Sequence, residues 1–173
     1  MEYISFQNTV LPLSDRLFRL ALRITMNRAE AEDVVQDTLL RVWERRSEWE
    51  QIDSLEAFAI ATCRNRALDV AKRAGRNTVP LDKVEGKHLP APNAQLSLEA
   101  REQLSIVRRL MDSLPELQRT IMHLRDIEGK TYGEIAEVLG ISETQVKVYL
   151  HRARSKVRAG LGNKGAGLGI MRD

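Results

Sequence analysis

Apolar residues recur along the chain every three or four positions, which is the spacing of one side of a helix. Two such stripes lie in the first third of the sequence: Leu17, Leu20, Ala21 and Ile24, then Ala31, Val34, Val35, Thr38 and Val42. No segment alternates between apolar and polar residues as a half-buried strand would. The pattern predicts an all-α protein.

Helix starts are marked by capping pairs, in which a Ser, Thr, Asn or Asp and a Glu or Gln three residues later bond to each other's backbone N–H groups. The pairs are Asn27 with Glu30, Asp53 with Glu56, Ser113 with Glu116, Thr131 with Glu134, and Ser142 with Gln145. They predict helices that run to about Arg46 and Arg73, and later helices that end at Gly129 and Gly140.

The segment from Gly75 to Leu96 interrupts this pattern and holds Pro80, Pro90 and Pro92. Proline breaks helices, and so long a structureless connection is uncommon inside one domain. Helical spacing resumes at Ser97. We therefore predict two small helical domains joined by a flexible linker and followed by a disordered tail. The predicted boundaries are 1–75 for the first domain, 76–96 for the linker, 97–161 for the second domain and 162–173 for the tail.

The second domain contains helix-turn-helix spacing from Thr131 to Arg154. Gly140 can adopt the left-handed conformation that the tight turn needs, and Ile141 and Val146 anchor the second helix against the first. The residues left to face outward are Glu143, Thr144, Lys147, Val148, His151 and Arg152. Lysines and arginines without any acid continue to Gly160, which favours DNA binding. The alternative is a helical hairpin with a solvated charged face.

A second basic run ends the helix that precedes the linker. It consists of Arg64, Arg66, Lys72, Arg73 and Arg76, against the single acid Asp69. Although the net charge is only +3, two separate basic patches suit a polyanion that is contacted at two places. The alternative is a solubilising helix end whose cations complement the helix dipole.

Three acids and one glutamine surround Leu40 on the side of its helix opposite the apolar stripe. These neighbours are Asp33, Gln36, Asp37 and Glu44. The side is either a face for a basic protein partner or a solvated acidic surface. Glu30, Asp33 and Asp37 also have the spacing of a magnesium site, but no histidine or third segment adds ligands. We predict no metal, no cofactor and no enzymatic activity.

Cys63 is the only cysteine, which excludes a disulfide framework and a Cys-based zinc cluster. Because it lies in the apolar run from Ala57 to Cys63, we expect a core thiol rather than a redox switch. That run is too short to cross a bilayer, and the N-terminus lacks the pattern of a secretion signal. We therefore expect a cytoplasmic protein.

Four stretches resemble, in order and spacing, the extracytoplasmic-function class of sigma factors, the two-domain sigma subunits of bacterial RNA polymerase. They are DRLFRLALRITMNRAEAEDVVQDTLLRVWE, SLEAFAIATCRNRALDVAKR, LPELQRTIMHLRDIEGKTYGEIAEVLGIS and VKVYLHRARSKV, and they cover about Arg16 to Arg158. The resemblance implies a protein that binds core RNA polymerase and directs promoter recognition and melting.

The resemblance implies that the first domain is sigma region two. Its first long helix would bind the clamp helices of the largest polymerase subunit through Asp33, Gln36, Asp37, Leu40 and Arg41. The loop from Arg46 to Ser54 would capture a flipped base of the minus-ten element. The melted strand and the upstream duplex would lie along Arg64, Asn65, Asp69, Lys72 and Arg73.

The second domain would be region four, which reads the minus-thirty-five element, and the linker would thread polymerase channels. The implied readers are Thr144, Gln145, Lys147, Val148, His151 and Arg152, with Arg154, Lys156 and Arg158 on phosphates. Val148 and Tyr149 stand where many members have a small or basic residue. No known promoter sequence is therefore carried over to this chain.

Two alternatives of different classes stay open. An ordinary helix-turn-helix regulator would bind palindromic half-sites as a free dimer, whereas a sigma factor is expected to be monomeric when free and to need core polymerase. A nuclease or recombinase would depend on Asp33 and Asp37. Members of the sigma family are commonly held inactive by an anti-sigma factor, which makes such a protein a candidate partner.

Overall fold

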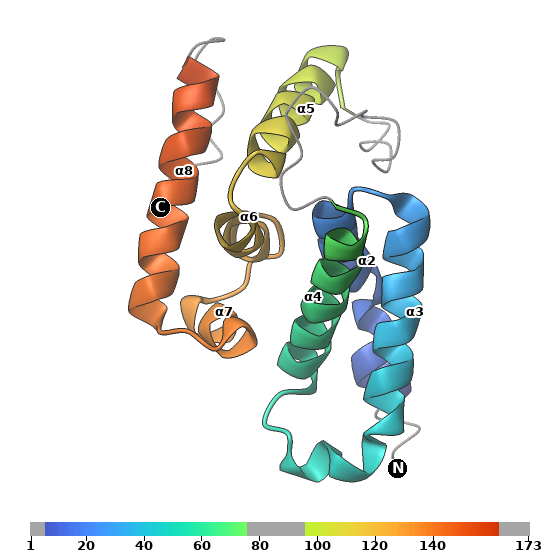
Figure 1. Cartoon of the computed structure of the whole chain (residues 1–173). Coiled ribbons are helices and arrows are strands. Elements are labelled where there is room, and N and C mark those ends of the chain that lie inside the picture. The colour runs from blue at the N-terminus through green and yellow to red at the C-terminus, as the bar shows by residue number, and fades with distance from the viewer. Residues whose placement is uncertain (1–5, 76–95, 163–173) are drawn as a thin grey trace. The chain divides into compact units, whose positions relative to one another are not determined.

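The computed structural model describes residues 6–75 and 96–162, and every regular element in these two ranges is helical (Figure 1). The chain forms two compact units that divide mainly at Thr78. Residues 6–75 make up the N-terminal region and residues 96–162 the C-terminal region. The predicted class of two small helical domains, the second with a helix-turn-helix, is confirmed. Almost all of the predicted linker and the tail beyond Gly162 lie outside the described residues.

The described N-terminal region is built on α2 (Ser14–Thr25), α3 (Arg28–Glu44) and α4 (Leu55–Arg73), each packed against the other two. Helical turns over Phe6–Val10 and Leu11–Leu13 precede α2, and a 3-10 helix over Arg46–Gln51 follows α3. Both predicted apolar stripes are buried along their whole length. Since the stripes face one another and α4, they form the core of this region.

The predicted start of α3 is confirmed. Asn27 has extended backbone angles, and its Oδ1 accepts a hydrogen bond from the Glu30 backbone N–H at 3.0 Å. The helix ends at Glu44, two residues before the predicted Arg46, and the chain continues directly into the 3-10 helix.

The predicted start of α4 is wrong by one residue. The cap is Ser54, whose hydroxyl oxygen accepts from the Ala57 backbone N–H at 3.1 Å, and not Asp53. The Glu56 carboxylate, assigned by sequence to that cap, accepts from the Arg16 guanidinium at 3.0 Å. Aspartate and serine are nearly equal as caps, so adjacent candidates are separated only by the backbone that the fold imposes.

The described C-terminal region contains α5 (Leu98–Asp112), α6 (Glu116–Met122), a π-helical turn over His123–Ile127, α7 (Tyr132–Leu139) and α8 (Glu143–Gly162). Helix α8 packs against α5 and α6, and its buried residues are Val146, Leu150, Ala153 and Val157. At Gly160 an added Cβ would collide with the Leu110 side chain, so a glycine there lets α5 and α8 approach closely.

The predicted N-cap at Ser113 is wrong. Its backbone is helical (φ −82°, ψ −11°), whereas an N-cap residue is extended. The Ser113 hydroxyl donates to the Leu110 carbonyl oxygen at 2.6 Å and closes the end of α5. Helix α6 begins three residues later, directly after Pro115.

Candidate DNA-binding and partner-binding surfaces

Two reciprocal capping pairs hold the helix-turn-helix segment. At α7 the Thr131 N–H donates to Glu134 Oε2 at 2.8 Å, and the Glu134 N–H donates to the Thr131 hydroxyl oxygen at 3.1 Å. At α8 the Ser142 N–H donates to Gln145 Oε1 at 2.9 Å, and the Gln145 N–H donates back to Ser142 Oγ at 3.1 Å. Between them Gly140 has a φ of +65°. The two predicted pairs and the predicted left-handed glycine are confirmed.

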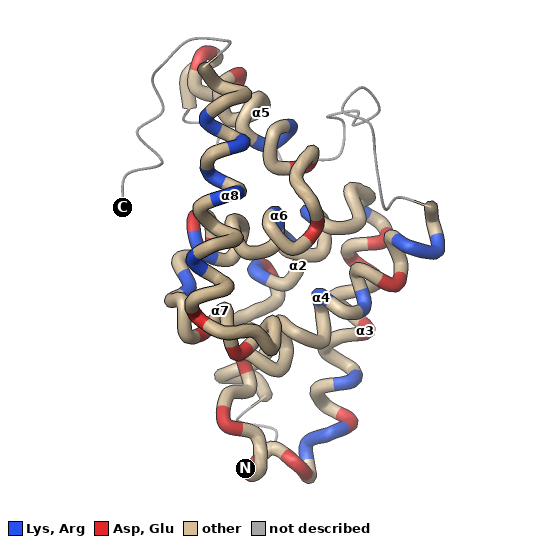
Figure 2. Tube along the Cα trace, turned by 60° about the vertical axis from the view of Figure 1, so that its left-hand side comes forward, with Lys and Arg blue, Asp and Glu red and all other residues tan. Residues whose placement is uncertain are grey.

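One side of α8 is buried in the C-terminal region and the other is open. The predicted readers, which are all exposed, are Thr144, Gln145, Lys147, Val148, His151 and Arg152. Figure 2 shows Lys and Arg recurring along this helix. Val148 is 43% exposed, so an apolar group is presented among cations. This is a surface suited to a groove that offers both phosphates and base edges.

Two tyrosine rings lie close to cations of this surface. Lys147 Nζ lies 5.4 Å from the centroid of the Tyr132 ring, and Arg152 Cζ lies 5.9 Å from that of Tyr149. Both distances fall within the range of cation–π contacts. Neither pair was predicted, although Lys147 and Arg152 themselves were. Tyr149 lies three residues before Arg152 on the same helix, which was an available signal, whereas Tyr132 lies on another helix and gave none for Lys147.

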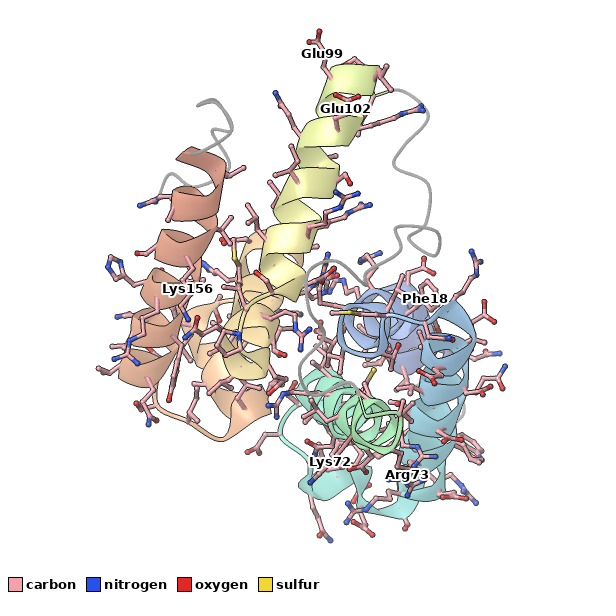
Figure 3. The ribbon with its side chains drawn as sticks, turned by 45° about the horizontal axis from the view of Figure 1, so that its top comes forward. Phe18, Lys72, Arg73, Glu99, Glu102 and Lys156 are labelled. Carbon is pink, nitrogen blue, oxygen red and sulfur yellow. The ribbon has the colours of Figure 1, made fainter. Side chains whose placement is uncertain are left out.

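Arg154, which was predicted from the sequence to contact a phosphate, forms an ion pair within the C-terminal region. Its Nη2 donates to Asp126 Oδ1 at 2.6 Å and its Nε to Oδ2 at 3.2 Å. The two side chains are only 13% and 11% exposed. This bidentate pair links α8 to the π-helical turn and leaves little of the guanidinium exposed to solvent. Lys156, labelled on α8 in Figure 3, and Arg158 are exposed.

On α3 the predicted partner-binding residues Asp33, Gln36, Leu40 and Arg41 are exposed, with Leu40 55% exposed. The remaining one, Asp37, accepts from Arg66 Nε of α4 at 2.9 Å. The acidic face is therefore neutralised in part from within the N-terminal region. Sequence reasoning missed this pair because the two residues lie far apart along the chain.

A shallow hollow of about 230 Å³ lies between α3 and α4 beside this ion pair. Its lining consists of Glu30, Asp33, Val34, Gln36, Asp37, Arg66 and Val70. Within residues 6–75 and 96–162 no three His, Cys, Asp or Glu side chains are grouped so as to hold a metal ion. The spacing of the three acids on α3 therefore does not produce a metal cluster.

The basic end of α4 is open to solvent. Asn65, Asp69, Lys72 and Arg73 are exposed and Arg64 is half-buried; Lys72 and Arg73 are labelled in Figure 3. Both lie in the last turn of the helix, where cations also complement the dipole. Binding to a polyanion and complementing the helix dipole, the two interpretations of these cations made from the sequence, are thus compatible with one another.

An aromatic cluster supports the segment between α3 and α4. The Phe6 ring stacks on Trp49 with centroids 6.2 Å apart and meets Trp43 edge-on at 5.3 Å. Trp49 Nε1 donates to the Val42 carbonyl oxygen at 3.0 Å. Arg46 Cζ lies 4.7 Å from the Trp43 ring centroid. Both indoles are therefore engaged within the protein, which sequence reasoning did not foresee.

Cys63 is a core residue, as expected from the sequence. Its Sγ donates to the Leu17 carbonyl oxygen at 3.4 Å. Burial raises the pKa of the thiol to about 12, against a smaller opposing effect of a hydrogen bond with Thr38. Among the described helices, none combines the length and the apolar character that crossing a membrane requires.

Family models match both regions. Residues 10–77 match the model of sigma-70 region 2, and residues 104–157 match that of sigma-70 region 4. The chain is 31% identical over 156 residues to the ECF RNA polymerase sigma factor SigE of Mycolicibacterium smegmatis, covering 89% of this chain and 60% of that protein. It is 36% identical over 126 residues to the ECF RNA polymerase sigma factor SigF of Caulobacter vibrioides, covering 72% of this chain and 66% of that one.

The chain thus spans about three fifths to two thirds of the length of these two curated relatives. Two solved structures share the fold. The sigma factor RpoE of Bartonella quintana, in complex with the anti-sigma factor NepR, has a TM-score of 0.72 at 23% identity, covering 92% of this chain and 98% of that one. CnrH in complex with the cytosolic domain of CnrY has a TM-score of 0.70 at 22% identity, covering 94% and 91%.

Proposed function

The chain belongs to the sigma-70 family, in its extracytoplasmic-function class, and we propose that it acts as a sigma factor that binds core RNA polymerase and directs promoter recognition and melting. The observation that carries the proposal is the presence of region 2 and region 4, in that order, on one chain. An ordinary operator-binding regulator needs only the second. The N-terminal region is therefore the part that distinguishes the two functions.

The C-terminal region contacts the upstream promoter element through α8. Thr144, Gln145 and Val148 face base edges, and Lys147, His151 and Arg152 face bases or phosphates. Because Gln145 Oε1 is used in the cap, its amide N–H groups are the donors left for a base. An exposed valine suits the methyl group of thymine. Lys156 and Arg158 hold phosphates, while Arg154 positions the helix through Asp126.

The N-terminal region binds core polymerase through α3 and the melted strand through α4. Asp33, Gln36, Leu40 and Arg41 supply exposed polar groups around one apolar side chain, and Asp37 acts from its pair with Arg66. Arg64, Asn65, Asp69, Lys72 and Arg73 line the path of the DNA. Unstacking bases costs a few kcal/mol, and a cationic surface that binds the displaced strand offsets this cost.

The protein works in the cytoplasm, where the polymerase is, and performs no covalent chemistry of its own. It is monomeric when free. A further partner is an anti-sigma factor: two solved structures that share its fold are complexes, one with the anti-sigma factor NepR and one with the cytosolic domain of CnrY.

The experiment is multi-round transcription by purified core polymerase on a library of genomic fragments, with and without the chain. New discrete start sites in the presence of the chain are expected, and their alignment defines both promoter elements. The matched control carries Leu40→Asp, which places a charge in the apolar centre of the α3 face and is expected to abolish the new starts without unfolding the protein, because Leu40 is exposed. Tight binding of free protein to a palindromic duplex, with no new starts, would establish the dimeric regulator instead.

A further inference from the structure

We propose that Tyr132 is a positioning residue for the upstream DNA contact, because its ring holds the Lys147 ammonium in place on the exposed face of α8. The inference rests on the proposed function, which assigns that face to promoter DNA. Tyr132 itself is the first residue of α7 and is half-buried. It was not among the residues assigned to DNA from the sequence.

The geometry joins three elements of the C-terminal region. Lys147 Nζ of α8 lies 5.4 Å from the Tyr132 ring centroid, and Arg125 Cζ of the π-helical turn lies 4.5 Å from the same centroid. Arg125 Nη1 in turn donates to the Lys130 carbonyl oxygen at 2.9 Å. The ring is therefore fixed by a guanidinium that is itself anchored to the backbone just before α7.

The Tyr132 ring lowers the entropy that the Lys147 side chain loses on binding DNA. A lysine side chain has four rotatable bonds, and ordering it on binding costs affinity. A ring that restrains the ammonium beforehand reduces that cost. Since an exposed cation–π contact is worth a factor of about two to five in an equilibrium constant, its loss should lower DNA affinity by a similar factor.

The matching tyrosine on α8 provides a control. Tyr149 is also half-buried, but its ring lies 5.9 Å from Arg152 and not beside Lys147. Removing the Tyr149 ring should therefore leave the contribution of Lys147 unchanged. A general loss of stability or packing would affect both tyrosine variants in the same way.

The test uses holoenzyme assembled from core polymerase and the full chain, on a promoter fragment taken from the mapped start sites. Affinity is measured for Tyr132→Phe, Tyr132→Leu and Tyr149→Leu, each alone and with Lys147→Ala. We expect Tyr132→Phe to bind within about twofold of the parent and Tyr132→Leu to lose about two- to fivefold. In the Lys147→Ala background Tyr132→Leu should cause no further loss, whereas Tyr149→Leu should cause the same loss in both backgrounds.

Additive losses for Tyr132→Leu and Lys147→Ala would overturn the proposal, and equal losses for the Phe and Leu variants would assign the role to the hydroxyl group instead. Should Tyr132→Leu fail to fold, NMR of the free full chain decides. The ring current should shift the Lys147 side-chain protons upfield in the parent and in Tyr132→Phe, and unshifted protons in both would refute the contact. Absence of any start sites with the parent would refute the sigma function itself, which is a separate outcome.

Discussion

The two regions of the molecule differ in how far apart along the chain the residues lie that make their characteristic contacts. In the C-terminal region the helix-turn-helix is fixed by contacts between close neighbours: two reciprocal capping pairs and a glycine at positive φ in the turn. In the N-terminal region the candidate partner surface depends on contacts between distant residues. Asp37 meets Arg66, and Phe6 meets Trp43 and Trp49. Contacts between sequence neighbours can be predicted from the sequence, whereas contacts between distant residues depend on the fold.

One ion pair of the C-terminal region also joins residues far apart along the chain, and breaking it is expected to have the largest effect on stability. In the C-terminal region Asp126 and Arg154 form a bidentate pair that is only 11% and 13% exposed. Removing one partner of a buried pair leaves an uncompensated charge and typically costs about 3–5 kcal/mol. We expect Arg154→Leu to lower the free energy of unfolding of the C-terminal region by about 3 kcal/mol, measured by urea unfolding followed by circular dichroism.

The control for this variant is the double change Arg154→Leu with Asp126→Leu. Replacing both charges by apolar groups of similar size should recover much of the loss, because no unpaired charge is left. A loss below about 1 kcal/mol for the single variant is typical of an exposed ion pair. It would favour the phosphate contact that was predicted for Arg154 from the sequence.

The capping residues give the next largest effect. Replacing a Ser or Thr cap by Ala costs about 1 kcal/mol, so Ser142→Ala should destabilise the C-terminal region and Ser54→Ala the N-terminal region by about that amount. Asp53→Ala is the matched control, since Asp53 is exposed and is not the cap. Both Trp residues lie in the N-terminal region. The midpoint of urea unfolding followed by Trp fluorescence therefore reports on Ser54→Ala and Asp53→Ala. Equal losses for Ser54→Ala and Asp53→Ala would restore the cap expected from the sequence.

These caps show how far sequence alone can go. Where a single candidate stood at the right spacing, as at Thr131 and Ser142, the prediction was confirmed to the residue. At Asp53 the prediction was wrong by one residue, because the neighbouring Ser54 is an equally good cap and the sequence spacing did not point to it. Ser113 was predicted to cap the start of the following helix, but its hydroxyl bonds to the end of the preceding one.

The candidate surfaces follow the same rule. Helical spacing correctly placed the exposed side of α8 and that of α3, since exposure depends on the local period. It could not show that Arg154 or Asp37 is engaged, because each partner lies on another element. The roles of these residues toward DNA and polymerase stay proposals.

The ion pair on the acidic face should contribute less than the pair in the C-terminal region. Asp37 and Arg66 have side chains 44% and 22% exposed, and pairs near the surface contribute about 0.2–1 kcal/mol. Asp37→Asn should therefore lower the free energy of unfolding, followed by Trp fluorescence, by about 0.5 kcal/mol. A loss as large as that expected for Arg154→Leu would remove the distinction between the two pairs. Affinity for core polymerase measured on the same variant separates its role in binding from its role in folding.

The two regions also differ in the way each leaves a helix. The C-terminal region uses Gly140, at a φ of +65°, for the turn before α8, whereas the N-terminal region ends α2 with Met26 at a φ of +55°. The left-handed conformation costs a residue with a side chain about 1–2 kcal/mol. Glycine at position 26 avoids this cost but loses more entropy on folding and the contacts of a half-buried methionine.

We therefore expect Met26→Gly to stabilise the N-terminal region by about 0.5 kcal/mol, seen as a higher urea midpoint by Trp fluorescence. The reverse change, Gly140→Ala, should destabilise the C-terminal region by about 1 kcal/mol. The space around Gly140 is open, so this loss would come from the backbone alone. If Met26→Gly instead destabilises, the contacts of its side chain outweigh the backbone strain. The end of α2 would then be another point at which packing in the N-terminal region prevails over the local rule that the C-terminal region obeys.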